Sequence, residues 1–283
     1  MDYVIVLTAS QDAGLSDDAI AGVRVQLSGP GEARRLGVAA AEIPVPTRQS
    51  AVAEGLDVNC VPAANRLKKL LIADMDSTMI PVECIDEVAD FAGVREQVVA
   101  ITEPAMRGEI SFDEALRARV ALMKGLPSKK LQQVYDERIR PNPGALTLVR
   151  TMRAKGAYTA LVSGGFTFFT ERVAATIGFE ENRANTLIIE DGVLTGSVGE
   201  PILGREAKLD ALNELTHRLG IGPDDVIAVG DGANDLAMIG AAGLGVAYHA
   251  KPVVADAADA SIRHGDLAAL LHLQGISAAE FIR

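Results

Sequence analysis

The sequence has no tryptophan, and only two cysteines and four histidines occur among its 283 residues. Two cysteines do not make the disulfide framework of a small secreted domain, and Cys60 and Cys84 do not have the spacing of zinc ligands. The histidines are scattered along the chain, which argues against a zinc site as well. These absences are typical of a protein from a reducing compartment, and we expect a cytoplasmic location.

Long apolar runs and an excess of positive charge are also lacking. No stretch reaches about 18 uncharged apolar residues, so we expect no transmembrane helix. Residues 1–7 contain a short apolar run without a basic region before it, so we expect no signal peptide. The net charge of −11 argues against nucleic acid or an anionic membrane as a partner. An anionic substrate would need local positive groups.

Three apolar stretches, each typical of a strand buried on both faces, end in a polar cluster. The stretches and their clusters are residues 70–73 with Asp74 and Asp76, residues 160–162 with Ser163, Gly164 and Gly165, and residues 226–229 with Asp231, Asn234 and Asp235. Because the carboxyl ends of parallel strands line one edge of a sheet, the three clusters should meet in one crevice. The pattern predicts an α/β protein with a doubly wound parallel sheet.

The carboxylates in this crevice would repel one another unless a cation or a proton neutralised them. Asp74, Asp76 and Asp231 offer the hard oxygen ligands that Mg²⁺ prefers, beside waters and a substrate phosphate. A single aspartate after a strand is often only a turn residue or a helix cap. That explanation is much weaker for a set shared by three strands, so the sequence predicts a magnesium site.

Two other interpretations of these clusters fail on their spacing. Ser163 suggests a serine hydrolase, but Leu161 stands where the Gly-x-Ser-x-Gly elbow needs its first glycine. The run that begins at Gly230 starts like a dinucleotide-binding fingerprint, but Asp235 occupies the place of the third glycine. Neither motif is complete.

The ordered motifs resemble those of the haloacid dehalogenase superfamily, and within it those of the phosphoserine phosphatases. The resemblance spans about residues 68–275 and rests on order and spacing together. The residues that carry it are Asp74-Met75-Asp76-Ser77-Thr78, Glu83, Val162-Ser163-Gly164-Gly165-Phe166, Lys208 and Gly230-Asp231-Gly232-Ala233-Asn234-Asp235. It implies a haloacid dehalogenase-like domain with a helical cap. It also implies hydrolysis of O-phospho-L-serine, the last step of serine biosynthesis.

The resemblance assigns roles to the residues that perform the chemistry. Asp74 would be the nucleophile that forms an aspartyl-phosphate, and Asp76 would protonate the leaving serine oxygen and later activate water. Ser163, the Gly164 amide and Lys208 would bind the phosphate. The position of Lys208 near the start of a helix gives it little support apart from the family order.

The resemblance also implies how the magnesium ion is held. Asp74 and Asp231 would supply carboxylate oxygens, and Asp76 would supply its main-chain carbonyl. Asp235 would add to the metal site, while Asn234 would support it from the side of the substrate.

Residues 84–140 are predicted to be a helical cap that closes over the crevice and excludes water. We expect helices over residues 85–92, 94–106, 111–124 and 128–139, the third of them with a capping box at Ser111 and Glu114. On that helix, residues 112, 116, 119 and 123 share one face, which places Arg119 among apolar side chains. A buried arginine needs an anionic partner, either a substrate or a structural carboxylate, unless it extends into solvent.

The resemblance implies that the cap residues recognise an amino acid. Arg119 would bind the substrate carboxylate, and Glu83 would bind the amino group. Met106 and Phe112 would line an apolar wall of the pocket, although both positions fit ordinary packing inside the cap equally well.

Residues 1–67 stand apart from the catalytic domain expected over residues 68–283. We expect a small α/β unit there, with strands over residues 3–8 and 36–43 and a helix over 17–27. The unit loosely resembles the ACT ligand-binding domains attached to some phosphoserine phosphatases. A prefix that stabilises the enzyme or makes it a homodimer fits the sequence as well. Farther along, residues 186–203 are predicted to form a hairpin with an Asp-Gly turn.

Two other functions are compatible with the sequence. One is a different phosphomonoesterase or phosphotransferase of the same superfamily, acting on another small metabolite. The other is a serine-binding regulatory protein on a decayed enzyme scaffold. The intact Asp74, Asp76, Lys208 and Asp231 argue against decay.

Overall fold

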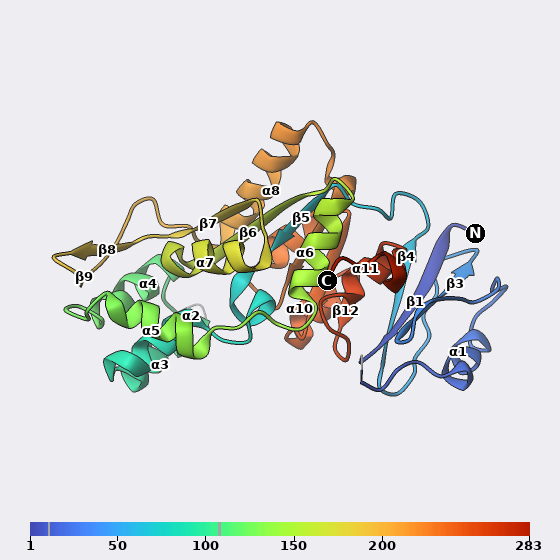
Figure 1. The fold of residues 1–283 in the computed structure, drawn as a ribbon, viewed down its shortest axis with the longest axis horizontal. Coiled ribbons are helices and arrows are strands. Elements are labelled where there is room, and N and C mark those ends of the chain that lie inside the picture. Colours follow the sequence, from blue (N-terminus) through green and yellow to red (C-terminus); the bar gives the residue numbers. More distant parts are fainter. Residues whose placement is uncertain (11, 107–108) are drawn as a thin grey trace.

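The computed structural model describes residues 1–10, 12–106 and 109–283, and for Met106 it describes only the backbone. These residues form a four-stranded, a six-stranded and a two-stranded sheet. Figure 1 shows the four-stranded sheet at one end of an elongated molecule and a group of helices, α2 to α5, at the other. The six-stranded sheet lies between them.

The central sheet is entirely parallel, with the strand order β12-β11-β10-β5-β6-β7. The chain enters it in the middle, at β5, and then adds strands first on one side and later on the other. This order confirms the predicted doubly wound sheet. Its strands are β5 (Leu70–Ala73), β6 (Tyr158–Phe166), β7 (Glu181–Asn185), β10 (Val226–Gly230), β11 (Leu244–Tyr248) and β12 (Ala260–Ile262).

Strand β5 is buried on both faces, which explains its continuous apolar sequence. Leu70 and Ile72 belong to an apolar core that includes α8 and α9. Leu71 and Ala73 belong to the core on the opposite face, which includes α6, α7 and α11. The helices outside the cap are α6 (Ala145–Ala154), α7 (Thr167–Ile177), α8 (Arg205–Leu219), α9 (Leu236–Ala241), α10 (Pro252–Ala257) and α11 (Ala269–Leu273).

The four predicted cap helices are confirmed; the first begins one residue earlier than predicted, and the other three are slightly shorter. Gly93 ends the first of them in the left-handed conformation, with φ 69°. The predicted capping box is present, because Ser111 Oγ accepts the Glu114 N–H while the Glu114 carboxylate accepts the Ser111 N–H. The cap helices are α2 (Cys84–Ala92), α3 (Arg95–Met106), α4 (Phe112–Ala121) and α5 (Lys129–Arg138).

The predicted hairpin consists of β8 (Leu187–Glu190) and β9 (Val193–Val198). Asp191 and Gly192 at its turn both have positive φ, as the Asp-Gly pair predicts. The hairpin also pairs with the cap. The N–H of Gly125 donates to the carbonyl of Leu194, and the N–H of Leu194 donates to the carbonyl of Leu126.

The four-stranded antiparallel sheet at the N-terminal end has the order β2-β3-β1-β4 and one helix, α1. The single strand predicted over residues 36–43 is wrong, since the chain reverses there and forms two strands. An unbroken apolar run hides the reversal, and Val38 at its tip is 79% exposed. The elements are β1 (Tyr3–Ala9), α1 (Asp17–Arg24), β2 (Arg34–Gly37), β3 (Ala40–Val45) and β4 (Leu56–Pro62), the last of which the sequence did not suggest.

Strand β4 also fastens this sheet to the central one. The Asn59 side chain forms two hydrogen bonds with the backbone of Ser261 in β12, one through its amide N–H and one through its oxygen. The buried Asp57 carboxylate accepts hydrogen bonds from three successive backbone N–H groups, those of residues 263–265. Side chains of β4 thus satisfy backbone groups beside the edge of the central sheet.

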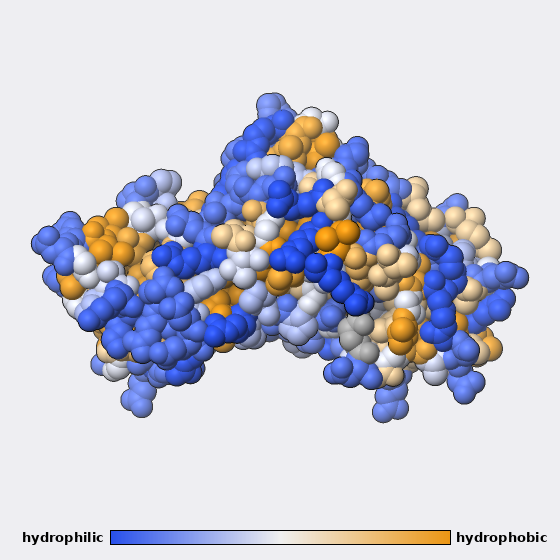
Figure 2. Space-filling model, in the orientation of Figure 1, coloured by the Kyte–Doolittle hydropathy of each residue, from blue (hydrophilic) through white to orange (hydrophobic). Residues whose placement is uncertain are grey.

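Hydrophilic residues cover most of the cap in the view of Figure 2, and apolar residues appear on that face in small groups. Large apolar side chains that are exposed include those of Val25 after α1, Val38 between β2 and β3, and Val253 in α10. Among the described residues, no helix is both long and apolar enough to cross a membrane.

Candidate active site

Asp74 directly follows β5 at the carboxyl edge of the sheet. Its N–H donates to the carbonyl of Val229 in the neighbouring strand β10, and its Oδ1 accepts the N–H of Met75 at 2.8 Å. The chain then turns through Ser77, which has a φ of 56°. Asp76, directly before this turn, contacts Ser163 on β6.

The ammonium group of Lys208 lies in the centre of the site. Its Nζ is 2.7 Å from Asp74 Oδ1 and 2.5 Å from Asp235 Oδ1, and the side chain is almost fully buried. Burial alone would lower the pKa of Lys208, but the charges of Asp74 and Asp235 outweigh that effect and raise it. Lys208 therefore carries a positive charge at neutral pH.

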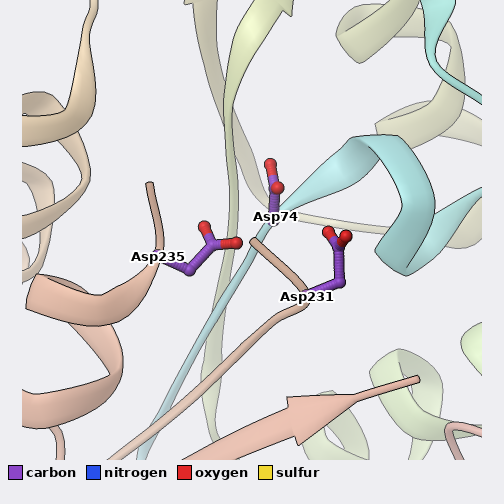
Figure 3. Close-up of side chains that lie close together, drawn as sticks. All are labelled: Asp74, Asp231 and Asp235. Atoms are coloured by element: carbon purple, nitrogen blue, oxygen red, sulfur yellow. The ribbon is translucent and has the colours of Figure 1, made fainter. Parts of the chain in front are cut away.

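Three aspartates converge beside this lysine. Asp74, Asp231 and Asp235 each offer a carboxylate oxygen, and these oxygens lie within 4.8 Å of one another (Figure 3). Asp231 comes from the end of β10, and Asp235 is the N-cap of α9. The site therefore joins the loops after two adjacent strands, as the sequence predicts.

Local contacts fix the orientation of the two later aspartates. Asp235 Oδ2 accepts the N–H of Gly232 at 3.0 Å, and Asp231 Oδ1 accepts the hydroxyl of Thr78 at 3.3 Å. A Cβ on Gly230 would lie 2.3 Å from Asp235 Cγ, so only glycine allows that carboxylate to lie against the strand end.

The positive charge in the cluster is too small to balance the negative charge of its carboxylates. Burial and the charge of Asp235 raise the pKa of Asp74 well above its ordinary value, and the same two causes raise the pKa of Asp231 to about 6. Lys208 is one positive charge among Asp74, Asp231, Asp235 and nearby Asp76. Three hard oxygen donors with unbalanced negative charge fit a divalent cation.

Asp76 has a different environment from these three. Its Oδ1 accepts the backbone N–H of Cys84 at 3.0 Å, and its Oδ2 accepts the hydroxyl of Ser163 at 3.3 Å. Burial and the charge of Glu83 raise the pKa of Asp76 to about 7. A carboxyl group with a pKa near neutrality can both donate and accept a proton, which is what an acid–base catalyst requires.

Ser163 and Gly164 lie near the end of β6, beside Asp76. The Ser163 hydroxyl oxygen also accepts the N–H of Gly165 at 2.9 Å, which holds the serine side chain over the loop. The cap helix α4 contributes Phe112 at this point. A Cβ on Gly164 would lie 3.1 Å from Phe112 Cζ, so the aromatic ring packs directly on the loop.

Glu83 and Arg119 lie on the cap side of the site. Glu83 Oε1 accepts the hydroxyl of Ser77 at 2.7 Å, and Arg119 Nε donates to the carbonyl of Ala115 at 3.2 Å. Burial lowers the pKa of Arg119, and the charges of Asp86 and Glu83 oppose this effect. Arg119 is half-buried, while the predicted neighbours of its helix face, Leu116 and Met123, are fully buried.

Two predicted site residues, Asn234 and Met106, are described by their position only. Asn234 is exposed and directly precedes Asp235 at the start of α9. Met106 is the last residue of α3, and its side chain lies outside the described residues. Its place in the substrate pocket stays a prediction.

Two buried polar residues of the site had no role predicted for them: Thr78, which the first motif includes, and Asn185, which no motif includes. Thr78 holds Asp231, and Asn185 binds backbone groups on two loops that border the site. Asn185 is the last residue of β7, in the same sheet, so the rule that polar residues end the strands applies to it. Strand β7 lacks the continuous apolar run of its neighbours, so the end of this strand is not visible in the sequence.

Known proteins resemble this chain in sequence and in fold. A family model described as haloacid dehalogenase-like hydrolase matches residues 71–240. The chain belongs to the haloacid dehalogenase-like hydrolases. Within that family it is 49% identical to a phosphoserine phosphatase of Polaromonas sp. over 229 residues, which is 78% of this chain and 97% of the relative. The chain is therefore also a member of the phosphoserine phosphatase family.

Solved structures of haloacid dehalogenase-like hydrolases agree with this assignment. One from Salmonella enterica serovar Typhi has a TM-score of 0.84 at 32% identity and covers 96% of this chain and 97% of its own. A phosphoserine phosphatase solved as a phospho-aspartyl intermediate analogue has a TM-score of 0.67 at 41% identity, and it covers 72% of this chain and 98% of its own.

Proposed function

We propose that the protein hydrolyses O-phospho-L-serine to L-serine and phosphate through a phosphorylated Asp74. The observation that carries the proposal is the meeting of Asp74, Asp76, Ser163 and Lys208 at the carboxyl ends of parallel strands. The relatives named above support it, since one of them is a phosphoserine phosphatase solved as a phospho-aspartyl intermediate analogue.

In the first step, Asp74 attacks phosphorus and the serine oxygen leaves. Lys208 and the Met75 N–H both bind Asp74 Oδ1, so Oδ2 is the more nucleophilic of the two oxygens. The leaving oxygen needs a proton. Asp76, with a pKa of about 7, is the group that can supply it.

In the second step, water cleaves the aspartyl-phosphate. Asp76 is ionised after the first step and removes a proton from the attacking water, which restores the protonated carboxyl group. The bond between phosphorus and the Asp74 oxygen breaks, Asp74 becomes a free carboxylate again, and orthophosphate leaves with the oxygen of the water. The hydroxyl of Ser163 and the ammonium of Lys208 hold the phosphoryl oxygens in both steps.

The cation that fits the cluster is Mg²⁺. Asp74, Asp231 and Asp235 would hold it, together with the main-chain carbonyl of Asp76 that the family resemblance implies. When bound, Mg²⁺ supplies positive charge to the phosphoryl oxygens. The protein's own contribution is to orient the three carboxylates and to neutralise part of their charge with Lys208.

Selectivity for an amino acid is assigned to the cap. Arg119 would bind the substrate carboxylate and Glu83 the ammonium group, since a closed site needs opposite charges for both. Phe112, which packs on Gly164, would close the pocket on the phosphate side, and Met106 would line its apolar wall. Closure of the cap would exclude water until the serine has left.

The remaining predictions concern the organisation of the protein. We propose that residues 1–67 and 68–283 are two domains, the first of them a stabilising prefix. The buried Asp57 and Asn59 in its contact with the central sheet support a fixed rather than a mobile attachment. A homodimer is a further prediction, and size-exclusion chromatography with light scattering tests it. A cytoplasmic location is another, and cell fractionation tests it.

The experiment that tests the function is a panel of phosphate esters assayed for phosphate release. Phosphoserine, phosphothreonine, glycerol phosphate and p-nitrophenyl phosphate are each offered with Mg²⁺ and with EDTA. We expect the highest kcat/KM for L-phosphoserine, and loss of activity in EDTA that Mg²⁺ restores. A preference for another ester identifies a different phosphomonoesterase. Serine binding without turnover identifies a regulatory protein on a decayed scaffold.

A further inference from the structure

The side chain of Asn185 is 2% exposed and forms three hydrogen bonds at the end of β7. Its amide nitrogen donates to the carbonyls of Gly164 at 2.9 Å and Leu203 at 3.1 Å. Its oxygen accepts the N–H of Leu203 at 2.7 Å. The nitrogen and the oxygen of the amide are thus both bound to main-chain groups, and all three hydrogen bonds run from the side chain to the backbone.

These hydrogen bonds join two segments that carry phosphate-binding groups. Gly164 follows Ser163 in the last part of β6. Leu203 precedes Gly204, which is the N-cap of α8, and Lys208 lies about one turn into that helix. A shift of Leu203 relative to Gly164 therefore moves the ammonium of Lys208 relative to the hydroxyl of Ser163.

The cap contacts the same two segments. A Cβ on Gly164 would lie 3.1 Å from Phe112 Cζ, and a Cβ on Gly204 would lie 3.5 Å from Phe112 Cδ1. The ring of Phe112 thus spans both loops that Asn185 holds together. Asn185 therefore holds in place the two backbone segments that Phe112 contacts.

We propose that Asn185 is a positioning residue for phosphoryl transfer, one that sets the distance between the Ser163 loop and Lys208. It does not touch the substrate, and it acts through the backbone of Gly164 and Leu203. The proposal rests on the proposed function of Ser163 and Lys208 as phosphate-binding groups. It predicts an effect on the phosphate end of any ester and none on recognition of the amino acid.

Two variants separate the hydrogen bonds from the packing. Asn185→Asp keeps the shape of the side chain but loses both amide donors and sets a carboxyl group against two carbonyl oxygens. Asn185→Ala loses all three hydrogen bonds and leaves a cavity. Asn182→Ala is the matched control, since Asn182 lies on the same strand and accepts a hydrogen bond from Thr170 Oγ1 at 2.8 Å.

The three variants and the unchanged chain are assayed with phosphoserine and with p-nitrophenyl phosphate, below the thermal midpoint of each protein. We expect Asn185→Asp and Asn185→Ala to lower kcat/KM for both esters by the same factor, about 10- to 100-fold, as a misplaced catalytic group does. The concentration of Mg²⁺ that gives half-maximal activity should stay unchanged, because Asn185 binds none of the aspartates. Asn182→Ala should stay within about threefold of the unchanged chain.

Three results overturn the proposal. They are activity of folded Asn185→Asp within about threefold of the unchanged chain, a loss for phosphoserine that p-nitrophenyl phosphate does not share, and failure of both Asn185 variants to fold. The last of these makes the residue structural. If the unchanged chain cleaves p-nitrophenyl phosphate but not phosphoserine, the proposed substrate is wrong. The comparison of variants on p-nitrophenyl phosphate then still tests Asn185.

Discussion

Asp76 Oδ2 accepts a hydrogen bond from Ser163 Oγ at 3.3 Å, although 87 positions separate the two residues. Asp76 follows β5, and Ser163 lies on β6, the strand directly beside it in the sheet. The proposed proton donor and a proposed phosphate ligand therefore face the same point. A phosphate ester bound at Ser163 would therefore have its bridging oxygen near Asp76, as the proposed proton transfer requires.

Replacement of Asp74 tests the nucleophile. Asp74→Asn should abolish turnover, since an amide does not attack phosphorus, and it should leave the fold intact because it removes one of several repelling carboxylates. Phosphate release and the thermal midpoint measure the two effects. Asp210→Asn, an exposed position on α8, is the control. Sustained turnover by Asp74→Asn, in protein shown by mass spectrometry to be free of deamidation, contradicts the assignment.

Replacement of Arg119 tests the recognition of an amino acid. Arg119→Ala should lower kcat/KM for phosphoserine by about 30-fold or more, the effect of losing a buried charged hydrogen bond. It should change kcat/KM for p-nitrophenyl phosphate little, because that ester has no carboxylate. Lys208→Ala should lower both, since it binds the phosphate.

The control for this comparison lies on the same helix. Arg117 is exposed and forms an ion pair with Glu200, so Arg117→Ala should leave the ratio of the two substrates unchanged. Equal losses for both substrates in Arg119→Ala would make Arg119 a structural residue of the cap.

The stability of the metal-free protein should depend on pH. The pKa of Asp76 in the folded protein is about 7 and that of Asp231 about 6, against 3.8 for an unperturbed aspartate. The folded state therefore holds protons that the unfolded chain releases, so stability falls as pH rises from about 4 to about 7. In EDTA, the thermal midpoint should be lower at about pH 8 than at about pH 5.

Mg²⁺ should reverse this trend, because it neutralises the ionised carboxylates in place of protons. We expect added Mg²⁺ to raise the thermal midpoint more at the higher pH than at the lower one. Asp231→Asn should flatten the dependence in EDTA. A midpoint in EDTA that rises between the two pH values would show that other groups control stability in this range.

A double-mutant cycle tests the contact between the cap and the Ser163 loop. Gly164→Ala keeps the backbone N–H but adds a Cβ 3.1 Å from Phe112 Cζ, so the ring must give way. We expect kcat/KM to fall about tenfold with both esters, because the cap closes less well. Phe112→Leu in the same chain should restore part of the activity, since a shorter side chain leaves room. Additive effects of the two changes would indicate that Phe112 does not limit closure.

The predictable part of the site follows from one rule about parallel sheets. Asp74, Ser163 and Asp231 each stand at the end of a continuous apolar run, and the structure brings all three runs to one edge. Burial on both faces makes such strands visible in the sequence. The cap helices were visible as well, because Gly93 and the Ser111 capping box mark their ends.

The parts that sequence reasoning missed depend on contacts between distant residues. Asn185 is the last residue of β7, a short and only partly buried strand. Nothing near it in the sequence shows that it binds Gly164 and Leu203. The same holds for β4, whose polar Asp57 and Asn59 look solvent-exposed until the central sheet is placed beside them. A local sequence pattern does not show which distant residue a polar side chain will bind.

The attachment of β4 to β12 has a consequence for how the protein avoids aggregation. An uncovered outer strand offers its free N–H and C=O groups to a strand of another molecule. Asn59 occupies such groups on Ser261, and Asp57 occupies the three N–H groups that follow the strand. A shortened chain that begins at Lys68 would expose this template, and we expect it to self-associate even where its catalytic residues are intact.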